Sequence, residues 1–208
     1  GAFPVLVGGD HAITFPTVQA FSRPLNIVYF DAHLDFTDEW KGVRLSHDNP
    51  LRRVSELPFV RGITIIGIRG VLSWANPYWE ARESGALIIP SLELRQQGVD
   101  TALSRIPMLG DSYVSIDIDI LDPAVAPGTG YPEPGGISYY ELKQALLGIA
   151  RRAKVVGFDL VEVSPAFDTT QRTTRTAARI ILDFLGVIFA SRSQTHQVER
   201  ELEKVSSK

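Results

Sequence analysis

Six runs of consecutive apolar residues, rich in Val and Ile, recur along the chain and alternate with stretches of mixed polarity. Continuous apolar runs of this length predict β-strands that are covered on both faces, as in a parallel sheet. The predicted strands are Pro4–Val7, Leu25–Phe30, Ile63–Ile68, Ala86–Ile89, Tyr113–Ile118 and Val155–Val161.

The stretches between these strands have the composition of helices. A Ser-x-x-Glu pattern beginning at Ser138 is a capping box and predicts that a helix starts there. Strands that alternate with helices indicate an α/β fold around a mostly parallel sheet. The predicted helices are Phe15–Phe21, Asn49–Ser55, Pro77–Glu83, Leu92–Arg105, Tyr139–Arg152 and Thr174–Ala190.

Composition favours one globular domain over residues 1–208. The chain is 44% hydrophobic with a formal net charge of −3, which suits a soluble protein with an ample core. Residues 194–208 alternate in charge, so we expect a solvated helix end or a disordered tail. The sequence starts GAFPVLVGGDH, without Met and with a strand under way, and we expect that an N-terminal segment is missing.

Several classes of protein do not fit the composition. Cysteine is absent, which excludes disulfides, thiolate metal sites and cysteine nucleophiles and is consistent with the reducing cytoplasm. No apolar run approaches the roughly 20 residues of a membrane span. The slight acidity and the lack of a basic stripe argue against a nucleic-acid partner.

Histidines and carboxylates collect where the predicted strands end. The second strand runs directly into Asp31, His33 and Asp35, which would share one face if the chain stayed extended. Parallel strands place their carboxyl ends at one edge of a sheet, where ligands bind. The candidate ligands at this edge are His11, Asp31, His33, Asp35, Asp117 and Asp119, and Glu162 follows the last strand.

A cation explains this cluster better than folding does. Four buried aspartates would repel one another, and a divalent metal removes that conflict. Oxygen and imidazole donors without sulfur suit Mn²⁺, or less often Fe²⁺, Co²⁺, Ni²⁺ or Zn²⁺. Six ligands suit two metals about 3.5–4 Å apart, which generate hydroxide from a bridging water. Each motif is weaker alone, since His11 could cap a turn and Asp117 could open an Asx turn.

Three longer motifs resemble the signatures of the ureohydrolases, the arginase and agmatinase family. They are GGDHAITFP, DAHLDF and SIDIDILDPAVAPGTGYPEPGG, and the resemblance runs from Gly8 to at least Pro165. It implies an arginase-like three-layer α/β/α sandwich with eight mostly parallel strands, of which this chain supplies about six, so that the N-terminal edge of the sheet is expected to be missing. It also implies two Mn²⁺ per chain and a homo-oligomer, either a trimer or a hexamer.

The resemblance also implies a role for each candidate. One manganese would be bound by His11 and Asp35 and the other by His33 and Asp119, while Asp31 and Asp117 would bridge both. The catalytic residues would be Asp119, Glu162 and His47. Glu162 would grip the substrate guanidinium through two hydrogen bonds, and His47 would shuttle a proton. The family usually has His-Gly where this chain has His47-Asp48.

The loop at residues 36–46 bears on the substrate. Asp38 and Trp40 are expected to contact it, and an acidic, aromatic mouth would attract a cationic amine. This favours an agmatinase-like enzyme of polyamine biosynthesis, which converts agmatine to putrescine and urea. Lys41 and Arg44 lie in the same loop, so a guanidino acid stays open as a substrate.

Other functions are compatible with the same metal ligands. Arginine, guanidinobutyrate, guanidinopropionate, proclavaminate and formiminoglutamate are alternative substrates. A non-catalytic ureohydrolase-like scaffold is a second class of function. A metallophosphatase is disfavoured, because the sequence has no phosphate-binding loop and places Glu162 where an anion would sit.

Overall fold

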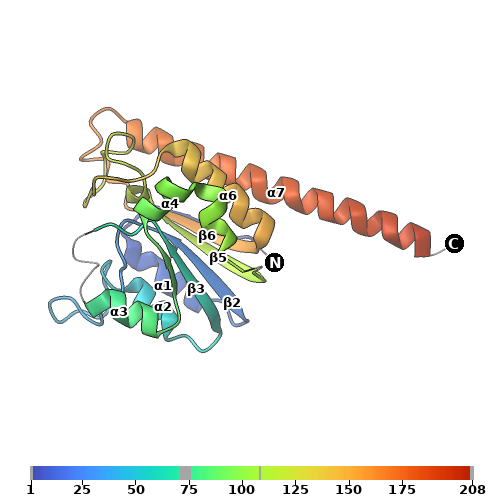
Figure 1. Cartoon of the computed structure of the whole chain (residues 1–208), viewed down its shortest axis with the longest axis horizontal. Helices are drawn as coiled ribbons and strands as arrows, with labels where there is room; N and C mark the ends of the chain where they lie inside the picture. Colours follow the sequence, from blue (N-terminus) through green and yellow to red (C-terminus); the bar gives the residue numbers. More distant parts are fainter. Residues whose placement is uncertain (1, 71–75, 108, 207–208) are drawn as a thin grey trace.

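A six-stranded parallel sheet forms the centre of the molecule (Figure 1). The computed structural model describes residues 2–70, 76–107 and 109–206, with side chains as far as residue 190. The strands lie in the order β1-β6-β5-β2-β3-β4, and every neighbouring pair is parallel. Their bounds are β1 Val5–Val7, β2 Leu25–Phe30, β3 Val60–Ile66, β4 Leu87–Ile89, β5 Asp111–Asp117 and β6 Lys154–Val161.

Helices cover both faces of the sheet, so the predicted three-layer α/β/α architecture is confirmed. Figure 1 shows α1, α2 and α3 on one side and α4, α6 and α7 on the other. The α-helices are α1 Thr14–Gln19, α2 Pro50–Ser55, α3 Asn76–Glu83, α4 Ser91–Gln97, α5 Val99–Ser104, α6 Tyr139–Arg152 and α7 Arg172–Ser206. Two 3₁₀ helices, η1 (His11–Ile13) and η3 (Ile118–Ile120), follow β1 and β5.

Alternate residues of the central strand supply the two cores. Val28 and Phe30 of β2 pack with α4 to α7. Ile27 and Tyr29 pack on the opposite face with α1, α2 and α3. Both sets are fully buried, which explains why the strands have nearly continuous apolar sequences.

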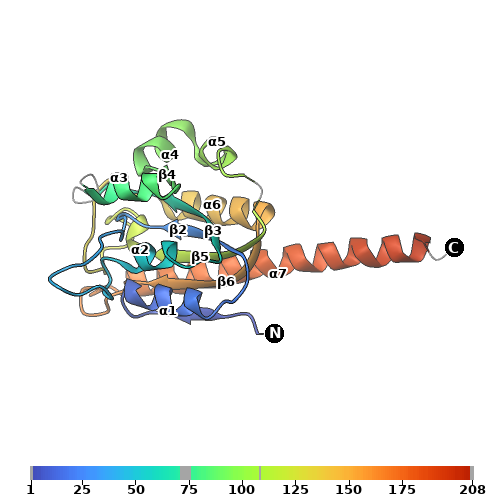
Figure 2. The same ribbon diagram turned by 90° about the horizontal axis from the view of Figure 1, so that it is seen from below.

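Two helices differ from the pattern in the sequence. The helix predicted over Leu92–Arg105 is divided into α4 and α5 at Gly98, whose left-handed φ of 82° ends the first helix. The last helix continues to Ser206, so most of the charged tail belongs to α7, which projects beyond the sheet in both Figure 1 and Figure 2. No helix within the described residues is long and apolar enough to cross a membrane.

The capping box of α6 gives a first prediction. The Ser138 hydroxyl accepts a hydrogen bond from the Glu141 N–H at 3.2 Å, and the Glu141 carboxylate accepts one from the Ser138 N–H at 2.7 Å. We expect Ser138→Ala to lower the free energy of unfolding by about 1 kcal/mol, because a helix N–H loses its partner. Urea unfolding measures this. Ser104→Ala, at the exposed end of α5, is the control and should change stability less.

Candidate metal centre

The loop after β1 places His11 in the interior. Gly8 and Gly9 have left-handed φ angles of 80° and 81°, which let the chain turn sharply at the end of the strand. Asp10 then caps η1 by accepting from the Ala12 N–H at 3.2 Å. As a result His11, the first residue of η1, is only 1% exposed.

The two aspartate-rich motifs leave their strands through turns. β2 ends at Phe30, and the Asp31 carboxylate accepts from the His33 N–H at 2.6 Å, while Asp35 has a left-handed φ of 49°. Asp117 likewise accepts from the Asp119 N–H at 2.8 Å. The expectation that an extended chain unites these side chains is therefore wrong. They converge because each first aspartate forms a hydrogen bond two residues ahead and folds the chain back.

The structure brings all six sequence-predicted ligands together in two overlapping groups. The His11 Nδ1 atom lies 3.0 Å from Asp31 Oδ2, 3.2 Å from Asp35 Oδ2 and 3.2 Å from Asp117 Oδ2. The His33 Nδ1 atom lies 3.4 Å from Asp31 Oδ1 and 3.0 Å from Asp119 Oδ2. Asp31 thus offers one carboxylate oxygen to each histidine.

The other expected bridge is arranged differently. Asp117 presents Oδ2 to His11, and its Oδ1 accepts from the Asp119 N–H, just as Asp31 Oδ1 accepts from the His33 N–H; among the described residues, however, no histidine nitrogen lies beside Asp117 Oδ1. Two compact sets of donor atoms result, one formed by His11, Asp31 and Asp117 and one by Asp31, His33 and Asp119. Asp31 is the residue that they share, and a bridging role for Asp117 stays a prediction.

Unpaired buried atoms test whether these residues fit a metal. His11 Nδ1 and Asp31 Oδ2 are both buried without a hydrogen-bond partner, although they lie 3.0 Å apart. Buried polar atoms are rarely left unpaired unless something else binds them. The donors are carboxylate oxygens and imidazole nitrogens, which suit a divalent first-row cation such as Mn²⁺. The set fits two cations that share Asp31.

Protons occupy this cluster when no cation is bound. Burial, followed by the charges of Asp35 and Asp119, raises the pKa of Asp31 to about 6. Burial and the charges of Asp119 and Asp31 also raise the pKa of Asp117. Burial opposes a charge on His33, but its hydrogen bonds to Asp119 and Asp31 outweigh it and raise the pKa of that imidazole. A metal must therefore displace protons to bind.

Three residues that sequence reasoning missed support the ligands. Tyr29 stacks on the His11 ring at 4.4 Å with 8° between the planes and donates to Asp35 Oδ2 at 2.8 Å. Ser115 lies 2.8 Å from His11 Nε2. Tyr29 and Ser115 each stand two residues before a ligand, so strand alternation could have identified them. Arg69 donates to the carbonyls of Asp119 and Glu133 and links their loops.

Glu162 lies against the His11 loop. Its backbone has a left-handed φ of 63°, and its N–H donates to the Gly9 carbonyl at 3.1 Å. Its Oε1 accepts from the His11 N–H at 2.7 Å. Burial raises the pKa of the Glu162 carboxyl group, and the His11 N–H partly offsets this. One carboxylate oxygen is thus fixed beside the cluster.

Tyr131, which the sequence analysis did not identify, lies in contact with both His47 and His33. Tyr131 stacks on the His47 ring with centroids 5.9 Å apart and meets the His33 ring edge-on at 6.5 Å. The Nε2 atom of His47 lies 3.5 Å from Asp48 Oδ2. The residue that replaces glycine after His47 therefore places a carboxylate beside the imidazole.

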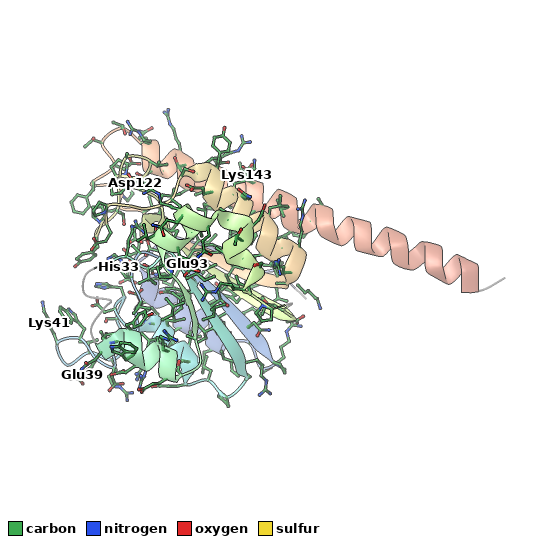
Figure 3. The ribbon with its side chains drawn as sticks, viewed as in Figure 1. His33, Glu39, Lys41, Glu93, Asp122 and Lys143 are labelled. Atoms are coloured by element: carbon green, nitrogen blue, oxygen red, sulfur yellow. The ribbon has the colours of Figure 1, made fainter. Side chains whose placement is uncertain are left out.

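The expected substrate contacts, Asp38 and Trp40, lie in a loop with its own pairing. Asp38 accepts from Arg44 at 3.1 Å and from Arg53 at 2.5 Å, which offsets its charge. Trp40 exchanges two backbone hydrogen bonds with Val43 and is 45% exposed. In Figure 3, Glu39 and Lys41 of this loop lie at the edge of the molecule, away from His33.

The sequence matches the arginase family over residues 1–186. It is 39% identical to the guanidinopropionase of Pseudomonas aeruginosa over 204 residues, covering 94% of this chain and 64% of that protein. It is 37% identical to the agmatinase of Bacillus subtilis over 191 residues, covering 89% and 63%. The chain spans less than two thirds of the length of these relatives.

Solved structures give the same result. The proclavaminate amidino hydrolase from Streptomyces clavuligerus superimposes with a TM-score of 0.79 at 33% identity, covering 88% of this chain and 64% of that one. The agmatine ureohydrolase of Thermoplasma volcanium superimposes with a TM-score of 0.81 at 29% identity, covering 93% and 65%.

The shared protons give a prediction for metal binding. Asp31, with a pKa of about 6, is ionised above that pH and protonated below it. We therefore expect Mn²⁺ affinity to fall by roughly tenfold per pH unit below pH 6 from this group alone, and Mn²⁺ addition at pH 5 to release its proton. Calorimetric titration at pH 7.5 and 5 measures both. The exposed Asp100→Asn variant should behave like the unsubstituted protein, and equal affinity at the two pH values would contradict the prediction.

Proposed function

The chain belongs to the arginase family, and from that premise we propose that it hydrolyses the guanidino group of a small linear substrate to an amine and urea. The observation that carries this proposal is the sharing of Asp31 between two histidine–aspartate groups beside Glu162. Paired cation sites also serve phosphatases, nucleases and aminopeptidases, and the neighbouring Glu162 carboxylate, which can pair with a guanidinium, is what favours this reaction.

Two Mn²⁺ would be held by the clustered donors. One group would bind through His11, the other through His33, and Asp31 would serve both. Bound there, the cations would lower the pKa of a water enough to supply hydroxide near neutral pH. The proposed reaction would therefore need no serine or cysteine nucleophile. The ligands are His11, Asp31, His33, Asp35, Asp117 and Asp119.

Glu162 would hold the guanidinium at the cluster. Because the His11 N–H fixes Oε1, the carboxylate is held in one orientation. No described residue forms a hydrogen bond with its other oxygen, which would be available to a substrate N–H. A cationic guanidinium also favours the ionised form of a carboxyl group whose pKa burial has raised. The same contact keeps the guanidino carbon next to the ligand His11.

His47 would give the departing amine its proton. An imidazole is the side chain most often used for such transfer. The Asp48 carboxylate lies 3.5 Å from Nε2, and the Tyr131 ring would keep the imidazole plane in place.

Agmatine and an ω-guanidino acid are the two candidate substrates. The carboxylates and aromatic rings of the 36–46 loop favoured agmatine in the sequence. The pairing of Asp38 with Arg44 and Arg53 favours the second candidate, since it leaves the loop less acidic than its carboxylates suggest. Relatives named for each substrate are similarly identical to this chain, at 37% and 39%.

Urea release tests the function. We expect the Mn²⁺-loaded chain to release urea from agmatine, guanidinopropionate or guanidinobutyrate, and chelation to abolish this until Mn²⁺ is restored. A colorimetric urea assay across these substrates and arginine measures the preference. Mn²⁺ binding with no urea from any of them would favour a non-catalytic scaffold.

Glu162→Gln tests the guanidinium contact. We expect kcat/KM to fall by roughly 10- to 150-fold, because a charge-assisted hydrogen bond contributes about 1.5–3 kcal/mol. Mn²⁺ affinity should stay close to that of the unsubstituted protein. Glu83→Gln, on the exposed end of α3, is the matched control. Unchanged kcat/KM in Glu162→Gln would rule out this role.

His47→Asn tests the proton transfer. We expect kcat to fall by about 10²-fold or more, which is typical for loss of a general acid, while the number of Mn²⁺ bound stays the same. Partial recovery of kcat by added imidazole would identify the missing group as a proton donor. Full turnover by the variant without imidazole would mean that the proton comes from elsewhere.

A further inference from the structure

A carboxylate lies behind His11, on the side away from the other ligands. Asp159 of β6 is fully buried and forms no salt bridge among the described residues. Three hydroxyl groups donate to it: Ser115 to Oδ1 at 2.6 Å, and Thr14 and Tyr113 to Oδ2 at 2.9 Å and 2.8 Å. Isolated buried charges are costly, so a residue of this kind needs a reason.

The hydrogens in this network can be counted. When Asp159 is ionised it only accepts, so the single hydroxyl hydrogen of Ser115 then points to it. Turning that hydrogen toward His11 or Thr14 would leave two acceptor oxygens 2.6 Å apart with no hydrogen between them. Ser115 Oγ must therefore accept from His11 Nε2, 2.8 Å away. The Nε2 atom carries a hydrogen, and Nδ1 is the nitrogen left to bind a metal.

We propose that Asp159 and Ser115 are positioning residues that keep Nε2 of His11 protonated and present Nδ1 as a lone-pair donor to the metal site. This inference rests on the proposed function, since it concerns the cation that His11 would hold. A partner on the second nitrogen of a histidine fixes its tautomer and its ring orientation. Here the Ser115 hydroxyl links His11 Nε2 to the buried Asp159 carboxylate, and we call this chain of two hydrogen bonds the Asp159 relay.

Among the described residues, the second histidine has no equivalent hydrogen-bonded chain to a buried carboxylate. His33 also turns Nδ1 toward the cluster, but its Nε2 faces Glu133 Oε1 directly at 3.7 Å, and the Glu133 side chain is 30% exposed. Loss of the Asp159 relay should therefore weaken one cation site and leave the other.

Ser115→Ala is the first test. The buried Ser112, three residues earlier in β5, donates only to the Gly110 carbonyl at 3.1 Å, and Ser112→Ala is the matched control. We expect Ser115→Ala to bind one Mn²⁺ as the unsubstituted chain does and the other about 10- to 100-fold more weakly. Electron paramagnetic resonance of free Mn²⁺ gives both affinities. Thermal unfolding of the metal-free variants should be alike.

Asp159→Asn is the second test and keeps the shape of the side chain. Its amide can donate to Ser115, which frees the hydroxyl hydrogen for His11 Nε2 and moves the imidazole hydrogen to Nδ1. We expect the same selective loss of one Mn²⁺. Two unchanged sites in both variants would overturn the relay but not the proposed function. Equal weakening of both sites, with a lower metal-free melting temperature than Ser112→Ala, would mean a structural role only. An unsubstituted chain that binds no Mn²⁺ would overturn both proposals.

Discussion

The site depends on four carboxylates and two imidazoles that lie in close contact, with His11, Asp31, Asp117 and Asp119 buried and His33 and Asp35 partly exposed. Without a cation these groups must share protons, as the raised pKa values of Asp31 and Asp117 indicate. Shared protons do not satisfy every atom, because Nδ1 of His11 and Oδ2 of Asp31 remain buried without a hydrogen-bond partner. The turns at Asp31 and Asp117 and the hydrogen bonds from neighbouring residues hold these like-charged groups together. A metal that binds there, as proposed, would replace their protons.

The sheet order makes this concentration of charge possible. The four strands that deliver the site residues, β1, β6, β5 and β2, are consecutive neighbours, although they are far apart in the sequence. The chain order reverses between β5 and β2, which is the type of position where open parallel sheets bind ligands. Asp35 and Glu162 have left-handed backbones here, and such strained conformations concentrate at functional sites.

Much of the fold and the donor set could be predicted from the sequence. Apolar runs covered on both faces located the strands, because a buried parallel strand has few polar positions. The capping box placed the start of α6, since its two hydrogen bonds are local. The six donors were identifiable from their residue types and from their position at strand ends. Local pattern was sufficient wherever the interaction was local or followed strand periodicity.

Tertiary structure alone decided how those residues meet. Asp31, His33 and Asp35 converge through a turn and not through an extended strand, and Asp117 directs one oxygen to a backbone N–H. Asp38 is paired with Arg53 from a helix that follows the loop. The relay from His11 to Asp159 joins residues 148 positions apart through Ser115. The sequence determined which chemical groups are available; hydrogen-bond direction and charge pairing need three-dimensional neighbours, and only the folded chain supplies them.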